Sequence, residues 1–236
     1  LSLWLRTAKI GRPLTKLVDK IVCANSLLEM PFSENSFDVV IGNPPYVRQE
    51  AIKEQKEALS KIYKVANGTA DLYVYFYEVS LKVLKINGIL GFITPNKFYK
   101  TNYAKELRNL LQSNKINILI DFFELKIFED ASTDSQIIIL EKNYLKNHTF
   151  HYCPIKNIEE FQTGQYEQIN IIQDNLKSEI WVFNNQKEKL ILNKMFKKYS
   201  TLKEYTNNGI EYGIKTGFNK AFIIDKPTKE KIIKED

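Results

Sequence analysis

The chain has 236 residues and a net charge of +6, and hydrophobic residues make up 44% of it. This apolar content excludes a globally disordered protein, and no apolar run approaches the length of a membrane-spanning helix. Since no signal-peptide pattern is present either, we expect a cytoplasmic protein. The basic balance favours a nucleic acid over an acidic partner.

The chain up to Glu141 alternates between strand and helix patterns. In chain order these patterns predict a helix over 1–8, strands over 21–24 and 37–42, a helix over 72–85, a strand over 89–94, a helix over 102–113, and strands over 116–123 and 135–141. Asp71 stands where it would cap the helix over 72–85, and Asn87-Gly88 where that helix would end. Strands that alternate with helices predict an α/β fold with a largely parallel, doubly wound sheet.

The pattern weakens beyond Asn143 into short strands and turns, with a predicted helix near 186–198. Three glycines then punctuate an aromatic and basic stretch: Gly209, Gly213 and Gly217. We expect a domain boundary between about 175 and 200. Residues 1–175 are assigned to one domain, and residues 176–236 to a linker and the beginning of a second.

The residues that commonly bind metals are few and scattered. Cys23 and Cys153 share no motif spacing, which predicts free, buried thiols. His148 and His151 are the only histidines, and no cluster of carboxylates or cysteines surrounds them. We therefore expect no metal site.

Asn43-Pro44-Pro45-Tyr46 directly follows the predicted strand over 37–42. Consecutive prolines fix φ and remove two backbone donors, so the loop can hold acceptor oxygens at a constant spacing. This suits methylation of a planar amine such as the exocyclic amine of adenine. The side-chain oxygen of Asn43 and the carbonyl of Pro44 would accept its two hydrogens, while Tyr46 stacks on the ring.

Four residues alone also fit a surface turn with a half-buried tyrosine. Their position at the carboxyl end of a predicted strand favours a site, because open α/β sheets bind ligands there.

Four stretches resemble the adenine-specific DNA methyltransferases of restriction–modification systems, in particular the TaqI-like and type IIG enzymes. FDVVIGNPPYVRQE is similar to their catalytic motif, and GIKTGFNKAFIID to the opening of their target-recognition domain. LSLWLRTA with VCANSLL, and DLYVYFYEVSLKVLKINGILGFITPNKF, are similar to the segments on either side of that motif. The resemblance implies a partial Rossmann-like methyltransferase domain, followed by the start of a target-recognition domain. It also implies S-adenosylmethionine as cofactor, double-stranded DNA as partner, and no metal in methyl transfer.

The resemblance also implies roles for individual residues. Asn43, Pro44 and Tyr46 would grip an adenine rotated out of the duplex, and Pro45 would line the methyl-donor side. Phe128 falls where the family places a second aromatic against the opposite face of the base. An ordinary core phenylalanine fits Phe128 equally well.

Cofactor and DNA contacts follow in the same way. Asn25 lies where the family usually has an aspartate that accepts a hydrogen bond from the cofactor's adenine, and Ser26 would flank that adenine. Lys215 and Lys220 would contact DNA phosphates, although solvated lysines are the commoner case. Asp71 could border the site, but its role as a helix cap already explains it.

The family's glycine-rich cofactor loop and its acidic ribose-binding residue would precede Leu1, and no stretch of this chain matches them. We therefore expect a fragment cut at both ends, with half of the catalytic site. Such a piece would bind S-adenosylmethionine weakly or not at all and would be inactive by itself.

Other functions stay open. The same loop serves methyltransferases of protein glutamine or RNA adenine, although GIKTGFNKAFIID argues against both. Asp121, Glu124 and Lys126 superficially suggest a metal nuclease, but their spacing is too short. An endonuclease fused in the full-length protein also stays open, as does a DNA-binding or assembly module without catalysis.

Overall fold

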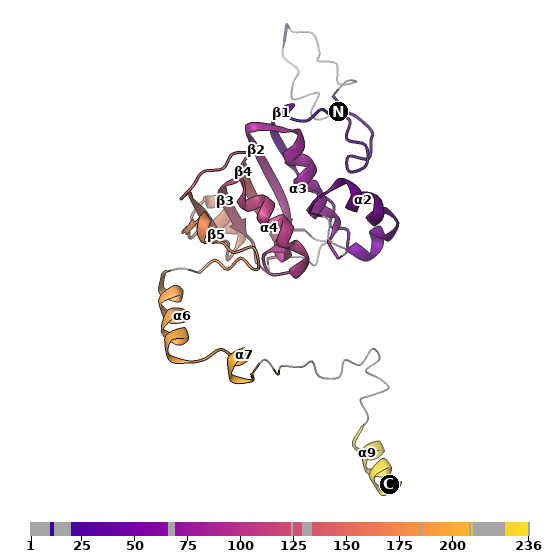
Figure 1. Cartoon of the computed structure of the whole chain (residues 1–236), viewed down its shortest axis with the longest axis vertical. Coiled ribbons are helices and arrows are strands. Elements are labelled where there is room, and N and C mark those ends of the chain that lie inside the picture. Colours follow the sequence, from indigo (N-terminus) through magenta and orange to yellow (C-terminus); the bar gives the residue numbers. More distant parts are fainter. Residues whose placement is uncertain are drawn as a thin grey trace. The chain divides into compact units, whose positions relative to one another are not determined.

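The computed structural model divides the chain into two compact units, Leu1–Asn185 and Gln186–Asp236 (Figure 1). The residues that it describes are 10–11, 20–65, 69–123, 125–128, 134–184, 186–207, 209 and 225–235. The predicted helix over 1–8, and Gly213 and Gly217, lie outside the described residues. None of the helices in the described part combines the length and the apolar content needed to cross a membrane.

Six strands form one sheet in the described part of the first unit, in the order β1-β2-β4-β3-β5-β6. Their bounds are Phe37–Gly42 (β1), Leu84–Pro95 (β2), Lys115–Asp121 (β3), Ser135–Glu141 (β4), Thr149–Pro154 (β5) and Ile169–Ile172 (β6). The β1–β2 and β3–β5 pairs are parallel, whereas β4 is antiparallel to both β2 and β3, and β6 is antiparallel to β5.

The α/β class is confirmed, but the sheet is mixed rather than largely parallel. The reason is the position of β4, which follows β3 with no helix among the described residues between them (122–123, 125–128 and 134) and inserts between β2 and β3. A connection without a crossover helix gives an antiparallel pair. The strand over 135–141 was itself predicted with its observed bounds.

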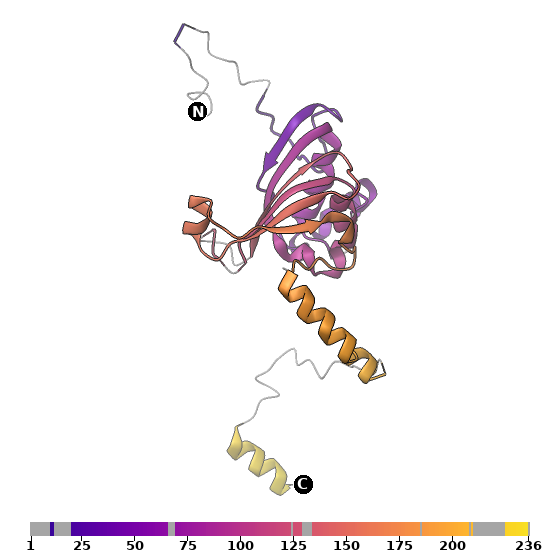
Figure 2. The same cartoon turned by 90° about the vertical axis from the view of Figure 1, so that its left-hand side faces the viewer.

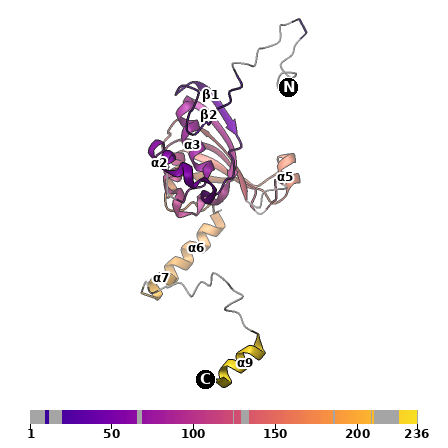
Figure 3. The same cartoon turned by 90° about the vertical axis from the view of Figure 1, so that its right-hand side faces the viewer.

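Helices cover one face of this sheet. α3 (Leu72–Val83) and α4 (Lys105–Gln112) pack on that face, with α2 (Lys56–Ile62) beside α3 (Figures 1 and 3). The short helix α5 (Ile158–Thr163) lies on the opposite side of the sheet (Figures 2 and 3). Four 3₁₀ segments connect these elements: Gln49–Gln55 (η1), Asn96–Tyr99 (η2), Asn102–Ala104 (η3) and Gln173–Asn175 (η4).

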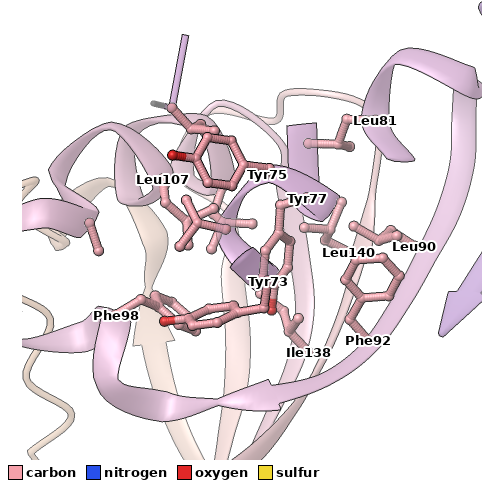
Figure 4. Close-up of a cluster of buried hydrophobic side chains, with 14 of the residues drawn as sticks. Tyr73, Tyr75, Tyr77, Leu81, Leu90, Phe92, Phe98, Leu107, Ile138 and Leu140 are labelled. Carbon is pink, nitrogen blue, oxygen red and sulfur yellow. The ribbon is translucent and has the colours of Figure 1, made fainter. Parts of the chain in front are cut away.

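The core between α3 and the sheet is rich in aromatic rings (Figure 4). Tyr73 and Tyr77 on α3 are completely buried, and Tyr77 meets Phe92 and Phe98 edge to face at centroid distances of 5.2 and 6.1 Å. Such pairs add to the free energy that burial of their area supplies. The aromatic residues of α3 therefore fix the helix against β2.

α3 ends at Val83, two residues before its predicted end, and the chain enters β2 directly. Asn87 adopts a positive φ of 63°, and a side chain at Gly88 would place its Cβ 2.8 Å from Leu84. The pairing of β1 with β2 shifts register at this point. Asn87-Gly88 therefore forms an irregularity inside a strand and does not end the helix.

The predicted strand over 21–24 is wrong. Ile21 and Val22 are 68% and 47% exposed, and these residues are not in a strand. Four apolar residues without a partner strand cannot satisfy their backbone groups in a sheet. Cys23 is accordingly exposed, against the expectation of a buried thiol, whereas Cys153 is buried.

The chain after η4 packs back onto the first unit. Trp181 is 1% exposed and stacks on Tyr99 at 6.3 Å. Arg108 of α4, which is completely buried, donates hydrogen bonds to four backbone carbonyls, those of Phe98, Thr101, Ser178 and Glu179. The first unit therefore includes the segment 176–184, which had been assigned to the second predicted domain.

The second unit contains three helices in its described residues: α6 (Gln186–Lys198), α7 (Leu202–Tyr205) and α9 (Lys226–Glu235). The predicted helix near 186–198 is confirmed as α6. Thr201 begins α7 with a capping box, in which its hydroxyl accepts from the Glu204 N–H and the Glu204 carboxylate accepts from the Thr201 N–H.

Candidate functional site

The carboxyl ends of β1, β2, β3 and β5 lie at the same edge of the sheet, since β5 is parallel to β3. β1 and β2 are parallel, and β4 is antiparallel to both β2 and β3, so β1, β2 and β3 run in one direction. Their carboxyl ends lead into Asn43, Asn96 and Phe122, and β4 begins beside them at Ser135. Strand ends of this kind are where α/β sheets bind ligands, so a site is expected at this edge.

The loop after β1 presents its polar residue to solvent. Asn43 and Pro45 are exposed, Pro44 is buried, and Tyr46 is partly buried. The two prolines restrict the backbone in the middle of the loop. This combination holds the Asn43 amide in the open on a backbone with little freedom.

Two hydrogen bonds fix the far end of this loop to the start of α3. The Val47 carbonyl accepts from the Leu72 N–H at 3.0 Å, and the Gln49 N–H donates to Oδ1 of Asp71 at 3.1 Å. Oδ2 of Asp71 faces the Tyr103 hydroxyl at 3.4 Å.

Asp71 occupies the predicted N-cap position of α3, but its side chain makes no capping hydrogen bond. Its carboxylate instead turns towards the loop, where the Gln49 N–H needs an acceptor. The prediction of a capping side chain was therefore wrong, and Asp71 shapes the loop of the candidate site.

The structure brings Tyr46 together with Phe128, although the whole of β2, α4 and β3 separates them in the chain. Their ring centroids lie 6.2 Å apart with planes inclined at 74°, which is an edge-to-face contact. Phe128 is partly buried, so it differs from the fully enclosed aromatics of the main core.

Burial raises the pKa of the Tyr46 phenol, an effect that the side chain of Ser135 partly opposes. A phenol is already neutral at physiological pH, and burial moves its pKa further from that range.

A buried polar network lies close to Tyr46. The Tyr77 hydroxyl and Oγ1 of Thr94 are 2.7 Å apart, and Nε2 of Gln136 donates to both, at 3.2 and 2.8 Å. All three side chains are completely buried. Because they come from α3, β2 and β4, the network ties together the three elements behind the edge.

The model of the Eco57I restriction-modification methylase family matches residues 6–128, which include the loop after β1 and end at Phe128. This chain belongs to that family. The family of restriction–modification methyltransferases predicted from the sequence is thereby confirmed.

Curated relatives agree with the family assignment. The chain is 30% identical over 225 residues to the type II restriction enzyme and methyltransferase RM.Eco57I of Escherichia coli. This alignment covers 90% of this chain and 22% of that protein. It is 29% identical over 210 residues to the methyltransferase M.BstVI of Geobacillus stearothermophilus, with 80% and 37% covered. For M.HindII of Haemophilus influenzae the values are 30% over 224 residues, with 84% and 42% covered. The chain thus spans less than half of the length of each of these relatives.

Solved structures of restriction–modification enzymes are also similar to this chain. The type IIL enzyme MmeI in complex with DNA matches with a TM-score of 0.43 and 19% identity, over 56% of this chain and 18% of that one. A type I methyltransferase subunit from Streptococcus thermophilus matches with a TM-score of 0.43 and 21% identity, over 74% and 35%.

The two residues assigned to the cofactor lie in a separate turn. Asn25 is exposed, and its Oδ1 accepts from the N–H groups of Leu27 at 3.1 Å and Leu28 at 3.3 Å. Ser26 is partly buried beside it. Lys215 and Lys220, the predicted phosphate contacts, lie outside the described residues.

Among the residues that the structure describes, no group of three or more His, Cys, Asp or Glu side chains is arranged to hold a metal ion. Of the residues that suggested a nuclease, Glu124 lies outside the described residues and Lys126 is exposed. Both oxygens of the Asp121 carboxylate accept hydrogen bonds from protein donors.

Sequence reasoning missed three contributors to this edge: Asn96, Ser135, and Asp121 as a structural acceptor. A signal was available, because Asn96 directly follows β2 as Asn43 follows β1, and Asp121 is the last residue of β3. The rule that drew attention to Asn43 applies to every parallel strand of the sheet.

Proposed function

We propose that the protein methylates N6 of adenine within a defined sequence of double-stranded DNA, with S-adenosylmethionine as the methyl donor. It would act as the modification enzyme of a restriction–modification system. One observation carries the proposal: a proline-restricted loop exposes Asn43 at the edge where Tyr46 meets Phe128. Membership of the methylase family supports the role in restriction–modification.

The chemistry follows from the loop. The amine of adenine is a poor nucleophile because its lone pair is delocalised into the ring. Oδ1 of Asn43 and the carbonyl of Pro44 would accept its two hydrogens and stabilise the positive charge that develops during attack. A preorganised polar group of this kind is worth about 10²–10³-fold in kcat.

The aromatic pair would receive the base. An adenine inside a duplex must rotate out before it can react, which costs a few kcal/mol. Stacking on aromatic rings returns roughly 1–3 kcal/mol per base. Tyr46 and Phe128 would provide these rings.

S-adenosylmethionine would supply an electrophilic methyl group. Pro45, which is exposed, would line that side of the loop, and Asn25 and Ser26 would contact the cofactor's adenine. Oδ1 of Asn25 already accepts two backbone hydrogen bonds, so its contact with the adenine requires Asn25 to release one of them. Lys215 and Lys220 remain the proposed phosphate contacts.

The proposal is tested by incorporation of labelled methyl groups from S-adenosylmethionine into plasmid DNA by the full-length protein. We expect label in N6-methyladenine, and a loss of about 10²–10³-fold or more in the Asn43→Ala variant. Asn109→Ala is the matched control, because Asn109 is an exposed asparagine on α4 away from this loop. Label in cytosine, RNA or protein, or full activity of Asn43→Ala, would overturn the proposal.

A second activity is favoured by one observation: RM.Eco57I is named both a restriction enzyme and a methyltransferase. We infer that the full-length protein also carries an endonuclease. In a plasmid-cleavage assay, cleavage should persist in the Asn43→Ala variant, since a separate domain would perform it. Absence of cleavage by the wild type would overturn this second assignment.

A further inference from the structure

The connection between β3 and β4 carries Phe128, and one residue holds both of its ends. Asn96, directly after β2, donates from Nδ2 to Oδ1 of Asp121 at 3.0 Å, where the connection begins. Its backbone N–H donates to the carbonyl of Asp134 at 3.0 Å, where the connection returns to β4.

Asp121 extends this attachment across the sheet. It is 2% exposed, and its Oδ1 also accepts from the Phe123 N–H at 3.1 Å, while Oδ2 accepts from the Tyr152 hydroxyl of β5 at 3.0 Å. One carboxylate thus receives donors from the connection and from the ends of β2 and β5.

Phe123 gives the reason why the connection needs such an acceptor. Its φ is +46°, a left-handed conformation that a bulky residue rarely adopts. The hydrogen bond from its N–H to Asp121 holds the turn by which the chain leaves β3. The direction in which the connection departs, and hence the place that Phe128 reaches, depends on this turn.

Burying the Asp121 carboxylate at this position costs desolvation free energy. Burial raises the pKa of Asp121, although the hydrogen bonds from Asn96, the Phe123 N–H and Tyr152 partly offset this. An apolar side chain would avoid the desolvation but would leave the three donors without an acceptor.

We propose that Asn96 and Asp121 are positioning residues that place Phe128 against Tyr46 and so build the pocket for the target base. The proposal rests on the proposed function. Neither residue has to touch the base, because each acts through the connection that carries Phe128. The hydrogen bonds that hold the far end of the loop after β1 join Val47 to Leu72 and Gln49 to Asp71, and neither of them involves Asn96.

The test is a double-mutant cycle on DNA methylation by the full-length protein, with Asn96→Ala, Phe128→Ala and the double variant. We expect Asn96→Ala to lower kcat by about 10- to 100-fold with little change in KM for DNA, because a misplaced group affects orientation more than binding. The double variant should be no worse than Phe128→Ala alone. Asn109→Ala should match the wild type.

A merely structural role would give a different result. If Asn96→Ala keeps the wild-type kcat, or if its loss multiplies with that of Phe128→Ala, the proposal is overturned. Should Asn96→Ala fail to fold, Asp121→Asn and Asp121→Ala form a second pair. Asn at 121 keeps the acceptor for Asn96 and Phe123 and should stay near wild-type activity, whereas Ala should lose activity. Equal activity of these two folded variants would also overturn the proposal.

Methylation by the wild type and by Asn43→Ala distinguishes a failure of the proposed function from a failure of the positioning role of Asn96 and Asp121. A wild type that transfers no methyl group to adenine overturns the proposed function and this proposal with it. An active wild type and an inactive Asn43→Ala, together with a normal Asn96→Ala, overturn the positioning role alone.

Discussion

Two loops meet at the carboxyl edge of the sheet, and they are held in place in different ways. The loop after β1 contains Pro44 and Pro45, which restrict its backbone from within. The connection after β3 contains neither proline nor glycine between Phe122 and Asp134, and its ends are attached to Asn96 and Asp121. Both are held by hydrogen bonds to neighbouring elements, but only the loop after β1 is also restricted by prolines of its own.

The difference has a practical consequence. A substitution inside the loop after β1 changes the conformation of that loop directly. The position of Phe128, by contrast, can be altered from β2 or β3 without any change to Phe128 itself. Three predictions test how far this distinction holds.

The segment 176–184 is a third case, because Arg108, which is distant from it in the chain, attaches it through the carbonyls of Ser178 and Glu179. Replacing Arg108 by Met should lower the free energy of unfolding by at least about 3 kcal/mol, since each buried carbonyl left without a donor costs about 1–3 kcal/mol. Urea denaturation measures the loss, and hydrogen exchange of the Trp181 amide, which is bonded to the Tyr99 carbonyl, should become faster.

Arg108→Lys is the matched variant for this prediction. It should be nearly as unstable, because one ammonium group cannot reproduce the guanidinium fork. Methyl transfer per folded molecule should stay normal in both variants. A loss of activity in well-folded Arg108→Lys would show that the segment 176–184 also takes part in the site.

The second-largest effect is expected for the aromatic pair, Tyr46 and Phe128. Tyr46→Ala and Phe128→Ala should each lower kcat/KM for DNA methylation by roughly 5- to 150-fold, which corresponds to about 1–3 kcal/mol of stacking. Tyr46→Phe and Phe128→Tyr keep the ring and should lose much less. If Tyr46→Phe were as impaired as Tyr46→Ala, the hydroxyl beside Ser135 and not the ring would be the important group.

The smallest effect is expected for Pro45→Ala. Pro45 is exposed, so its replacement should cost about 0.4–1 kcal/mol of stability, mainly because the unfolded chain gains freedom. Pro31→Ala, at another exposed proline, controls for this effect. We expect a measurable fall in kcat for Pro45→Ala and none for Pro31→Ala. Equal kcat values would contradict the view that proline restriction holds the loop for catalysis.

Much of the fold and one half of the candidate site were predictable. The bounds of β4 and α6 followed from their residue patterns, and the loop from Asn43 to Tyr46 was recognised from adjacent residues. Asp71 was correctly expected at the start of α3, but the use of its carboxylate was not foreseen, because a side chain that can cap a helix can equally accept from a distant N–H.

Short-range information was sufficient wherever a property depends on neighbouring residues, such as the period of an apolar strand or the φ restriction of consecutive prolines. It was insufficient for the insertion of β4 between β2 and β3, for the contact of Tyr46 with Phe128, and for the attachment of the Phe128 connection to Asn96 and Asp121. These depend on which segments meet after the chain has folded, and burial and hydrogen bonding between distant residues select that arrangement.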